Sequence, residues 1–265
     1  MNQNMHHNQK PHEAHQPSHP KPFDAPVTAE EMQRMPGVED RSKRTRISKI
    51  FHLGRNLHQA VLFADPVHYR DQATGQWQEI DNTLIPRTDA AGHTFLTNRA
   101  NDELNVEFHD TTDAATVLLQ DEQHHLLAWK LADAQEIAPV RVDRPCLEHN
   151  DCDLRRDVLA HIEDEVLYAA IFPGVDLRCR IQGLSFKDEL VFHAPEAVRP
   201  VTFVLAAPGL RPVLRENGDI DWLASDDSVD SVVFTLPKPF LKDQQPEHAT
   251  GAVAVALEPL EEDLW

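Results

Sequence analysis

The chain has 265 residues, of which 41% are hydrophobic and 26% are charged, and its formal net charge is -19. This length suits one large domain or two small ones, and it is enough to bury a hydrophobic core. No run of 18 apolar residues occurs, which excludes a membrane-spanning helix. The acidic surface repels phosphate backbones and argues against a nucleic-acid partner. Three cysteines cannot supply a framework of several disulfides.

The N-terminal stretch, residues 1–46, differs in composition from the rest of the chain. Five histidines lie there among Gln, Asn and Pro residues: His6, His7, His12, His15 and His19. Such a segment buries too little apolar area to offset its ordering entropy, so we predict a disordered leader. It is not a signal peptide, because no run of 7–15 apolar residues follows Met1. The histidines could bind a transition metal, although a polar low-complexity leader is the simpler interpretation.

A basic cluster closes this leader and consists of Arg41, Lys43, Arg44, Arg46 and Lys49. Residues 1–49 hold eight Lys and Arg against six Asp and Glu, a balance of +2, which leaves -21 for the body. Such a cluster could bind nucleic acid or anionic lipid, expose a cleavage site for a trypsin-like protease, or address the protein to a specialised secretion system. A solvated linker, or packing against an acidic neighbouring surface, is the more common outcome.

From residue 50 onward, short apolar runs with period-two alternation predict β-strands. The predicted strands are 57–63, 77–85, 93–98, 104–108, 116–120, 124–131, 165–171, 175–182, 185–193, 201–206, 219–224, 231–236 and 252–257. The polar turn at 71–76, with Gly75, is expected to join the first two as a hairpin. Asn217-Gly218 favours a type I′ hairpin turn. In this part of the chain, a helix is a candidate only at about 150–162.

This pattern predicts an all-β fold, built as one antiparallel β-sandwich or as two packed sub-sandwiches. The predicted divisions are a first β-rich half at 47–142, an insert at 143–165 that holds the candidate helix, and a second β-rich half at 166–265. Long amphipathic helices between the strands are absent from the pattern, which argues against βαβ units.

Several motifs in collinear order carry a resemblance to a known family. They are SKIFHLG (48–54), QAVLFADPVHYRD (59–71), GQWQEIDNTL (75–84), NRAND (98–102), LNVEF (104–108), IFPGVDLRCRI (171–181), GLSFKDELVF (183–192), GLRPVLRENGDIDW (209–222) and VVFTLPKPFLKD (232–243). Together they resemble the N-terminal β-rich module of bacterial DNRLRE-domain and RHS (YD-repeat) surface and secreted proteins. Nothing after residue 243 resembles the DNRLRE domain or the YD repeats themselves.

The resemblance implies a non-catalytic module with a structural, surface-interaction or effector-packaging role, and no cofactor. It implies a protein or glycan partner at the bacterial surface or secretion apparatus. The location it implies is secreted or cell-surface, by specialised export from the cytoplasm since a signal peptide is absent. Among the matched residues, Trp77 and Ile80 are expected to pack in the core or between the sheets. The side chains of Asp81, Asn82 and Thr83 can bond the backbone at a turn.

Two further groups could carry chemistry. Cys146, His149 and Cys152 have a spacing suited to zinc, which needs a fourth ligand, but free thiols or a Cys146–Cys152 disulfide in an exposed loop are the simpler interpretation. Trp129 and Trp222 could form a sugar-binding platform, which would make the chain a carbohydrate-binding module or a remnant glycan-active enzyme. Alternating strands more often bury such tryptophans. No nucleophile elbow, zinc-protease motif or P-loop occurs, so no catalytic residue is assigned.

Overall fold

The computed structural model describes residues 37–54, 57–142, 161–225, 230–243, 251–261 and 263–265. Within these ranges the chain forms β-strands and two short 3-10 helices, η1 (Arg41–Lys43) and η2 (Pro195–Ala197). The predicted all-β class is therefore confirmed. None of the described helices has the length and apolar character needed to cross a membrane. The leader histidines, almost all of the candidate helix at 150–162, and Cys146, His149 and Cys152 lie outside the described residues.

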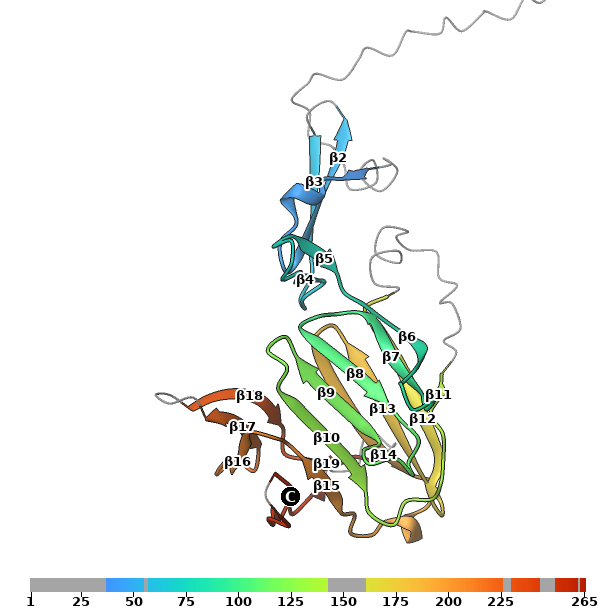
Figure 1. Ribbon diagram of the computed structural model, residues 1–265. Helices are drawn as coiled ribbons and strands as arrows, with labels where there is room; N and C mark the ends of the chain where they lie inside the picture. The colour runs from blue at the N-terminus through green and yellow to red at the C-terminus, as the bar shows by residue number, and fades with distance from the viewer. Residues whose placement is uncertain (1–36, 55–56, 143–160, 226–229, 244–250, 262) are drawn as a thin grey trace, which may run out of the picture. The chain divides into compact units, whose positions relative to one another are not determined.

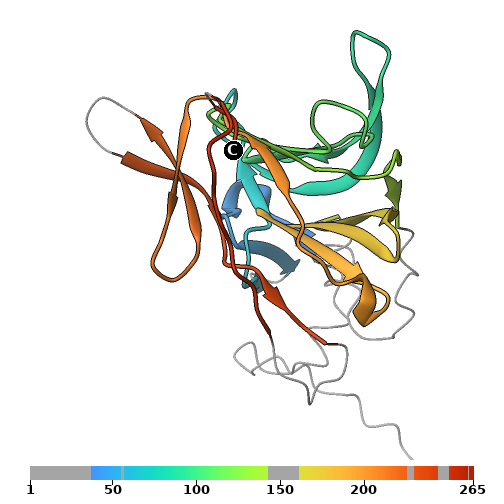
Figure 2. The same cartoon turned by 90° about the horizontal axis from the view of Figure 1, so that it is seen from below.

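The largest part of the fold is a sandwich of two antiparallel sheets, drawn mainly in green and in yellow in Figure 1. The six-stranded sheet has the order β15-β10-β9-β8-β7-β6 and is built from β6 (Asp81–Thr88), β7 (Thr94–Ala100), β8 (Leu104–Phe108), β9 (Val117–Asp121), β10 (Leu126–Leu131) and β15 (Phe203–Ala206). The four-stranded sheet has the order β11-β12-β13-β14 and is built from β11 (Val140–Arg141), β12 (Glu163–Phe172), β13 (Val175–Gln182) and β14 (Ser185–Phe192). Figure 2 shows the green and yellow strands as two layers.

Four smaller sheets complete the described fold. The N-terminal ones are β1-β2-β3, from β1 (Val38–Glu39), β2 (Ser48–Gly54) and β3 (Leu57–Leu62), and β4-β5, from β4 (His68–Arg70) and β5 (Trp77–Glu79). The C-terminal ones are β16-β17-β18, from β16 (Leu210–Leu214), β17 (Ile220–Ser225) and β18 (Asp230–Leu236), and β19-β20, from β19 (Phe240–Leu241) and β20 (Gly251–Ala252).

Most of the predicted strands form, because their side chains alternate between core and solvent. β8 and β13 show this directly, since every second residue along each strand is buried. One hydrophobic core collects these residues from both sheets of the sandwich and from β17; its largest fully buried members include Phe108, Tyr168, Leu177 and Trp222. In these two strands, period-two alternation in the sequence therefore predicted correctly which side chains are buried.

Alternation did not identify strand partners. The turn at 71–76, in which Gly75 has a φ of +68°, joins β4 to β5, whereas β3 pairs with β2. The predicted hairpin between 57–63 and 77–85 is therefore wrong in its partners. At 252–257 only the first residue lies in a strand, although Val255 and Leu257 pack against the core. Burial alone produces that alternation without a neighbouring strand.

The turn between β16 and β17 also differs from its prediction. Gly218 has a φ of +91°, but Asn217 is not among the residues with positive φ, and a type I′ turn needs positive φ at both. The amide of Gly218 donates to Arg215 O at 2.9 Å, and the amide of Arg215 donates to Asp219 O at 2.8 Å. This pattern fits a type I turn followed by a glycine bulge, which also suits the right-handed twist of the strands.

The two predicted halves share one sheet. β15, from the second half, pairs with β10, from the first, with Leu205 opposite Trp129. At the other end, residues 37–46 lie in the same compact unit as the sandwich, because the unit begins at Gly37 and β1 pairs with β2. β12 likewise begins at Glu163, inside the predicted insert. The structure thus places these boundaries differently from composition alone.

A buried asparagine network links the six-stranded sheet to the ends of β12 and β13. The Asn82 side-chain amide donates to Ile162 O at 2.7 Å and to Gly183 O at 2.8 Å. Its oxygen accepts from Asn101 at 2.9 Å and from Asn98 at 3.2 Å. All three asparagines are buried. The predicted side-chain-to-backbone bond of Asn82 is confirmed, but it reaches across the sandwich instead of closing a local turn.

Candidate functional site

The basic segment 41–49 folds into a compact charged cluster instead of a solvated linker. Arg44 and Lys49 are 6% and 5% exposed, whereas Arg41, Lys43 and Arg46 are at the surface. Lys43 pairs with Asp40 at 2.9 Å, and Arg46 pairs with Glu103 at 2.5 Å. The basic residues therefore pack against acidic neighbours. This was one of the two sequence interpretations that assigned no binding function to the cluster.

Arg44 lies at the centre of this cluster and bridges two glutamates from different sheets. Its Nε and Nη2 each lie 2.7 Å from an oxygen of Glu39, which is the bidentate geometry that makes such pairs strong. Nη2 also donates to Glu79 Oε1 at 3.1 Å, and Lys49 Nζ donates to the same oxygen. The cluster is consequently neutralised internally, with two cations facing two carboxylates.

His68 completes the cluster from β4, where its side chain is 0% exposed. Its Nδ1 lies 2.7 Å from Thr45 O, and because a carbonyl oxygen can only accept, the proton sits on Nδ1. Burial, assisted by the charges of Arg44 and Lys49, lowers the pKa of His68 below its usual value and keeps the ring neutral. Its Nε2 is buried and has no hydrogen-bond partner.

The pKa values of Glu39 and Glu79 lie below the usual glutamate value, and the contacts of the two carboxylates explain why. Burial raises the pKa of Glu39, but the hydrogen bonds and charge of Arg44 outweigh it and the pKa falls below 4.5. Burial likewise raises the pKa of Glu79, and Lys49 followed by Arg44 reverse the effect. A carboxyl whose pKa is depressed by folding stabilises the protein above its unfolded pKa, and this contribution is lost as the pH falls.

Replacing Arg44 with methionine is expected to lower the free energy of unfolding by about 2 to 3 kcal/mol at neutral pH, because Glu39 and Glu79 lose their shared counter-charge. Urea unfolding measured from pH 7 to pH 3 should show that the variant loses less stability than the wild type below pH 4.5, the ordinary glutamate pKa. Exposed Arg87 changed to methionine is the control, with an expected effect under about 0.5 kcal/mol. Parallel pH profiles for wild type and the Arg44 variant would contradict this account.

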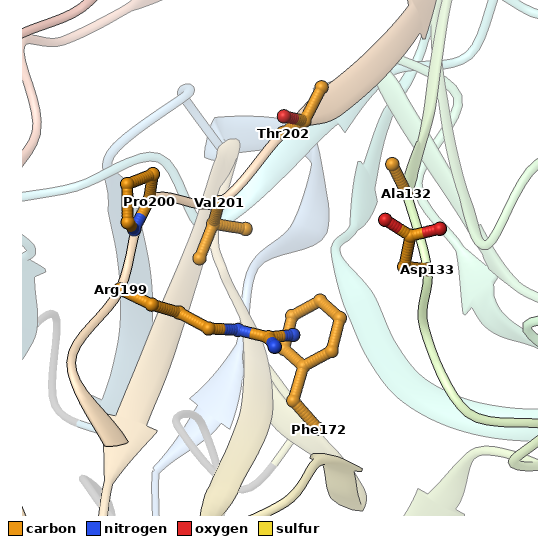
Figure 3. A pocket seen from close by; sticks show the side chains of 7 residues that line it. All are labelled: Ala132, Asp133, Phe172, Arg199, Pro200, Val201 and Thr202. Atoms are coloured by element: carbon orange, nitrogen blue, oxygen red, sulfur yellow. The ribbon is translucent and has the colours of Figure 1, made fainter. Parts of the chain in front are cut away.

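A pocket of about 250 Å³ lies where the chain leaves β10 and β12 and enters β15. Figure 3 shows the Arg199 guanidinium lying across the ring of Phe172, 4.0 Å from its centre, with Asp133 opposite. Ala132, Pro200, Val201 and Thr202 line the remainder. Its size is below the range of about 300 to 1,000 Å³ typical of ligand sites. It contains one acid and one permanent cation, so it offers no general acid–base pair.

The two tryptophans proposed as a sugar platform are both core residues. Trp129 is 4% exposed and its ring packs edge-on against Phe203 at 5.3 Å, while Trp222 is 0% exposed. Neither ring face is available to a sugar, because both side chains point to the inner face of their strands. Ile80 is buried as expected, and Trp77 is half-buried.

Sequence reasoning missed Glu39, His68 and Glu79. They are far apart in the chain and belong to no spaced motif, so nothing local signals that they meet. The available signal was indirect: His68 and Glu79 both lie inside blocks that carried the family resemblance, PVHYR and WQEID.

Comparison with known proteins gives relatives for most of the chain, while no family model and no solved structure matches it. WapA of Bacillus subtilis subsp. natto, named a tRNA(Glu)-specific nuclease, is 26% identical over 214 residues, 80% of this chain and 8% of that protein. WapA of Bacillus spizizenii, named a tRNA3(Ser)-specific nuclease, is 25% identical over the same coverage. A wall-associated protein of Geobacillus stearothermophilus is 20% identical over 213 residues, 80% of this chain and 77% of that protein.

These names correct two expectations. The non-catalytic module with a structural, surface-interaction or effector-packaging role, and the carbohydrate-binding alternative, are contradicted because the WapA relatives are named for nuclease activity on tRNA. The exclusion of nucleic acid is contradicted for the same reason. Net charge misled because it averages over a chain, whereas phosphate contacts depend on local cations. This chain also spans only 8% of the WapA proteins, so its charge does not describe theirs.

Proposed function

We propose that this chain is a segment of a bacterial cell-surface effector of the WapA kind, whose activity is the cleavage of tRNA. The observation that carries the proposal is the alignment of 80% of the chain with three proteins named as tRNA nucleases. Because the chain spans 8% of their length, the nuclease activity is proposed for the whole gene product that contains it. The cell-surface location follows from the relative named wall-associated protein.

We also propose, more specifically, that the segment is the β-rich module that precedes DNRLRE domains or YD repeats. In support of this proposal, residues from separate motifs of the resemblance lie within hydrogen-bonding distance of one another. Asn82 from IDNTL contacts Asn98 and Asn101 from NRAND, and the side chains of Asn82 and Asn101 bond the backbone of Gly183 in the block 183–192. A set of motifs that forms one buried network is a more specific signature than the same motifs scattered over a surface.

Contact with tRNA is best supported at the exposed face of the basic segment. Arg41, Lys43 and Arg46 are exposed there, and within the described ranges no acidic partner is found for Arg41. Each phosphate contact releases condensed counterions, so binding through these residues should weaken steeply with salt.

The expected result is that the native gene product containing this chain cleaves total tRNA, as read on a denaturing gel. Changing Arg41, Lys43 and Arg46 together to glutamine should weaken tRNA binding several-fold at low salt and reduce the salt slope, because up to three phosphate contacts are lost. A matched variant with Lys187, Arg87 and Lys130 changed to glutamine controls for the same change in net charge. Intact tRNA after incubation with the native product would overturn the proposal.

A further inference from the structure

Three side chains in the N-terminal sheets, Glu39 of β1, His68 of β4 and Glu79 of β5, are arranged as a metal site would be. Each offers one ligand atom, and these atoms all lie within 4.8 Å of one another. Zinc binds carboxylate oxygen and imidazole nitrogen at about 2.0 to 2.2 Å, which puts neighbouring ligand atoms a little over 3 Å apart. Closing the gap takes side-chain movements of up to about 1.5 Å, and Glu79, at 49% exposed, has the freedom to move.

The orientation of His68 provides a second, independent observation. Its Nδ1 donates to Thr45 O, so the lone pair is on Nε2, which is the nitrogen left for a ligand. Metal-bound histidines usually have this arrangement, in which a carbonyl or carboxylate fixes the ring and its tautomer through the other nitrogen. In the protein Nε2 is buried and unpartnered. A buried acceptor without a partner destabilises the folded protein, and a bound cation would remove this cost.

Arg44 and Lys49 determine how tightly such a site can bind. Both donate to Glu79, and Arg44 also holds Glu39, so an incoming dication competes with two resident cations. The competition is incomplete, since each carboxylate has about four lone-pair sites and Arg44 uses only two of those on Glu39. Lys49 is the more readily displaced competitor, because an ammonium on a flexible stem makes one contact where the guanidinium makes several.

We propose that Glu39, His68 and Glu79 bind one divalent transition-metal ion of the zinc type, in exchange with the Lys49 ammonium. Two carboxylates and one imidazole form a donor set suited to such ions, and they leave a fourth position for water. The site is independent of the proposed tRNA cleavage, and its failure would leave that proposal untouched.

The test is a calorimetric titration of the full 265-residue chain with Zn²⁺ alone. Other strong ligands are first removed by changing the leader histidines to glutamine, Cys146 and Cys152 to serine, and His149 to glutamine. This background protein is expected to bind one Zn²⁺ per chain and to unfold at a higher temperature in its presence, because the ion binds only the folded arrangement.

Variants in this background separate the ligands from the competitor. Glu79→Gln is expected to weaken binding by about tenfold or more. Because it also removes the counter-charge of Lys49, its folding is checked by urea unfolding before the titration. His68→Gln should abolish binding, and Lys49→Met should tighten it several-fold by removing the competing charge. Glu122→Gln, an exposed change of equal charge, is the matched control and should leave the Kd unchanged.

A background protein that binds no Zn²⁺ at one per chain overturns the proposal. So does a Glu79→Gln variant whose Kd equals that of the control, or a folded Lys49→Met variant that binds no more tightly than the background. Glu79 is an exposed ligand and Lys49 is the competing cation. Their variants therefore test the proposal even if His68→Gln does not fold.

Discussion

Replacing Asn82 with alanine is expected to lower the free energy of unfolding by about 4 kcal/mol, which is a large share of the stability of a typical domain. The side chain makes four hydrogen bonds within the buried part of the sandwich, two as donor and two as acceptor. Alanine would leave the carbonyls of Ile162 and Gly183 with fewer donors, and would leave Asn98 and Asn101 facing an empty acceptor position. Each buried group left without a partner costs about 1 to 3 kcal/mol.

Urea unfolding with a constant slope would measure this loss. Asn217→Ala is the matched control, because that asparagine is exposed in the turn before β17 and its side chain makes only local bonds to Asp219. We expect the control to lose about 1 kcal/mol or less. If both variants lost equally little, the network would be a minor contributor and the motif blocks would have to be explained differently.

The second large effect is expected at Trp222, where alanine should cost about 3 to 5 kcal/mol. The indole is fully buried in β17, pairs across the sheet with Pro212 and Phe234, and lies edge-on to Trp265 with ring centres 6.4 Å apart. Removing it leaves a cavity that the surrounding β-strands cannot fill, because their backbone hydrogen bonds hold them in place.

Trp222→Phe separates packing from polarity at this position. The indole Nε1 is buried without a partner, so phenylalanine removes an unsatisfied donor while keeping an aromatic ring. We expect it to lose about 1 to 2 kcal/mol, clearly less than alanine. Thermal and urea unfolding of the two variants would check the order. A Trp222→Ala protein as stable as the wild type would show that the ring is not a core residue.

The candidate site itself could not be found from the sequence. The basic residues of 41–49 were visible as a cluster, but their partners Glu39 and Glu79 come from strands of two and three residues. Strands that short carry almost no periodic signal, and the pairing of Arg44 with Glu79 spans 35 positions. The same limitation explains why β1, β4, β11 and β19 were not predicted. It also explains why a solvated linker was expected where the structure has an ion-paired cluster.

What the sequence determined by itself is the all-β class and the position of most long strands. Each of these depends on local alternation, which is set by the pleat of a single strand. Only the tertiary structure decided which strands pair, as with β3 and β2 or β15 and β10, and which charged groups meet around Arg44 and His68. Pairing joins residues far apart in the chain, and its energy comes from contacts that no single segment contains.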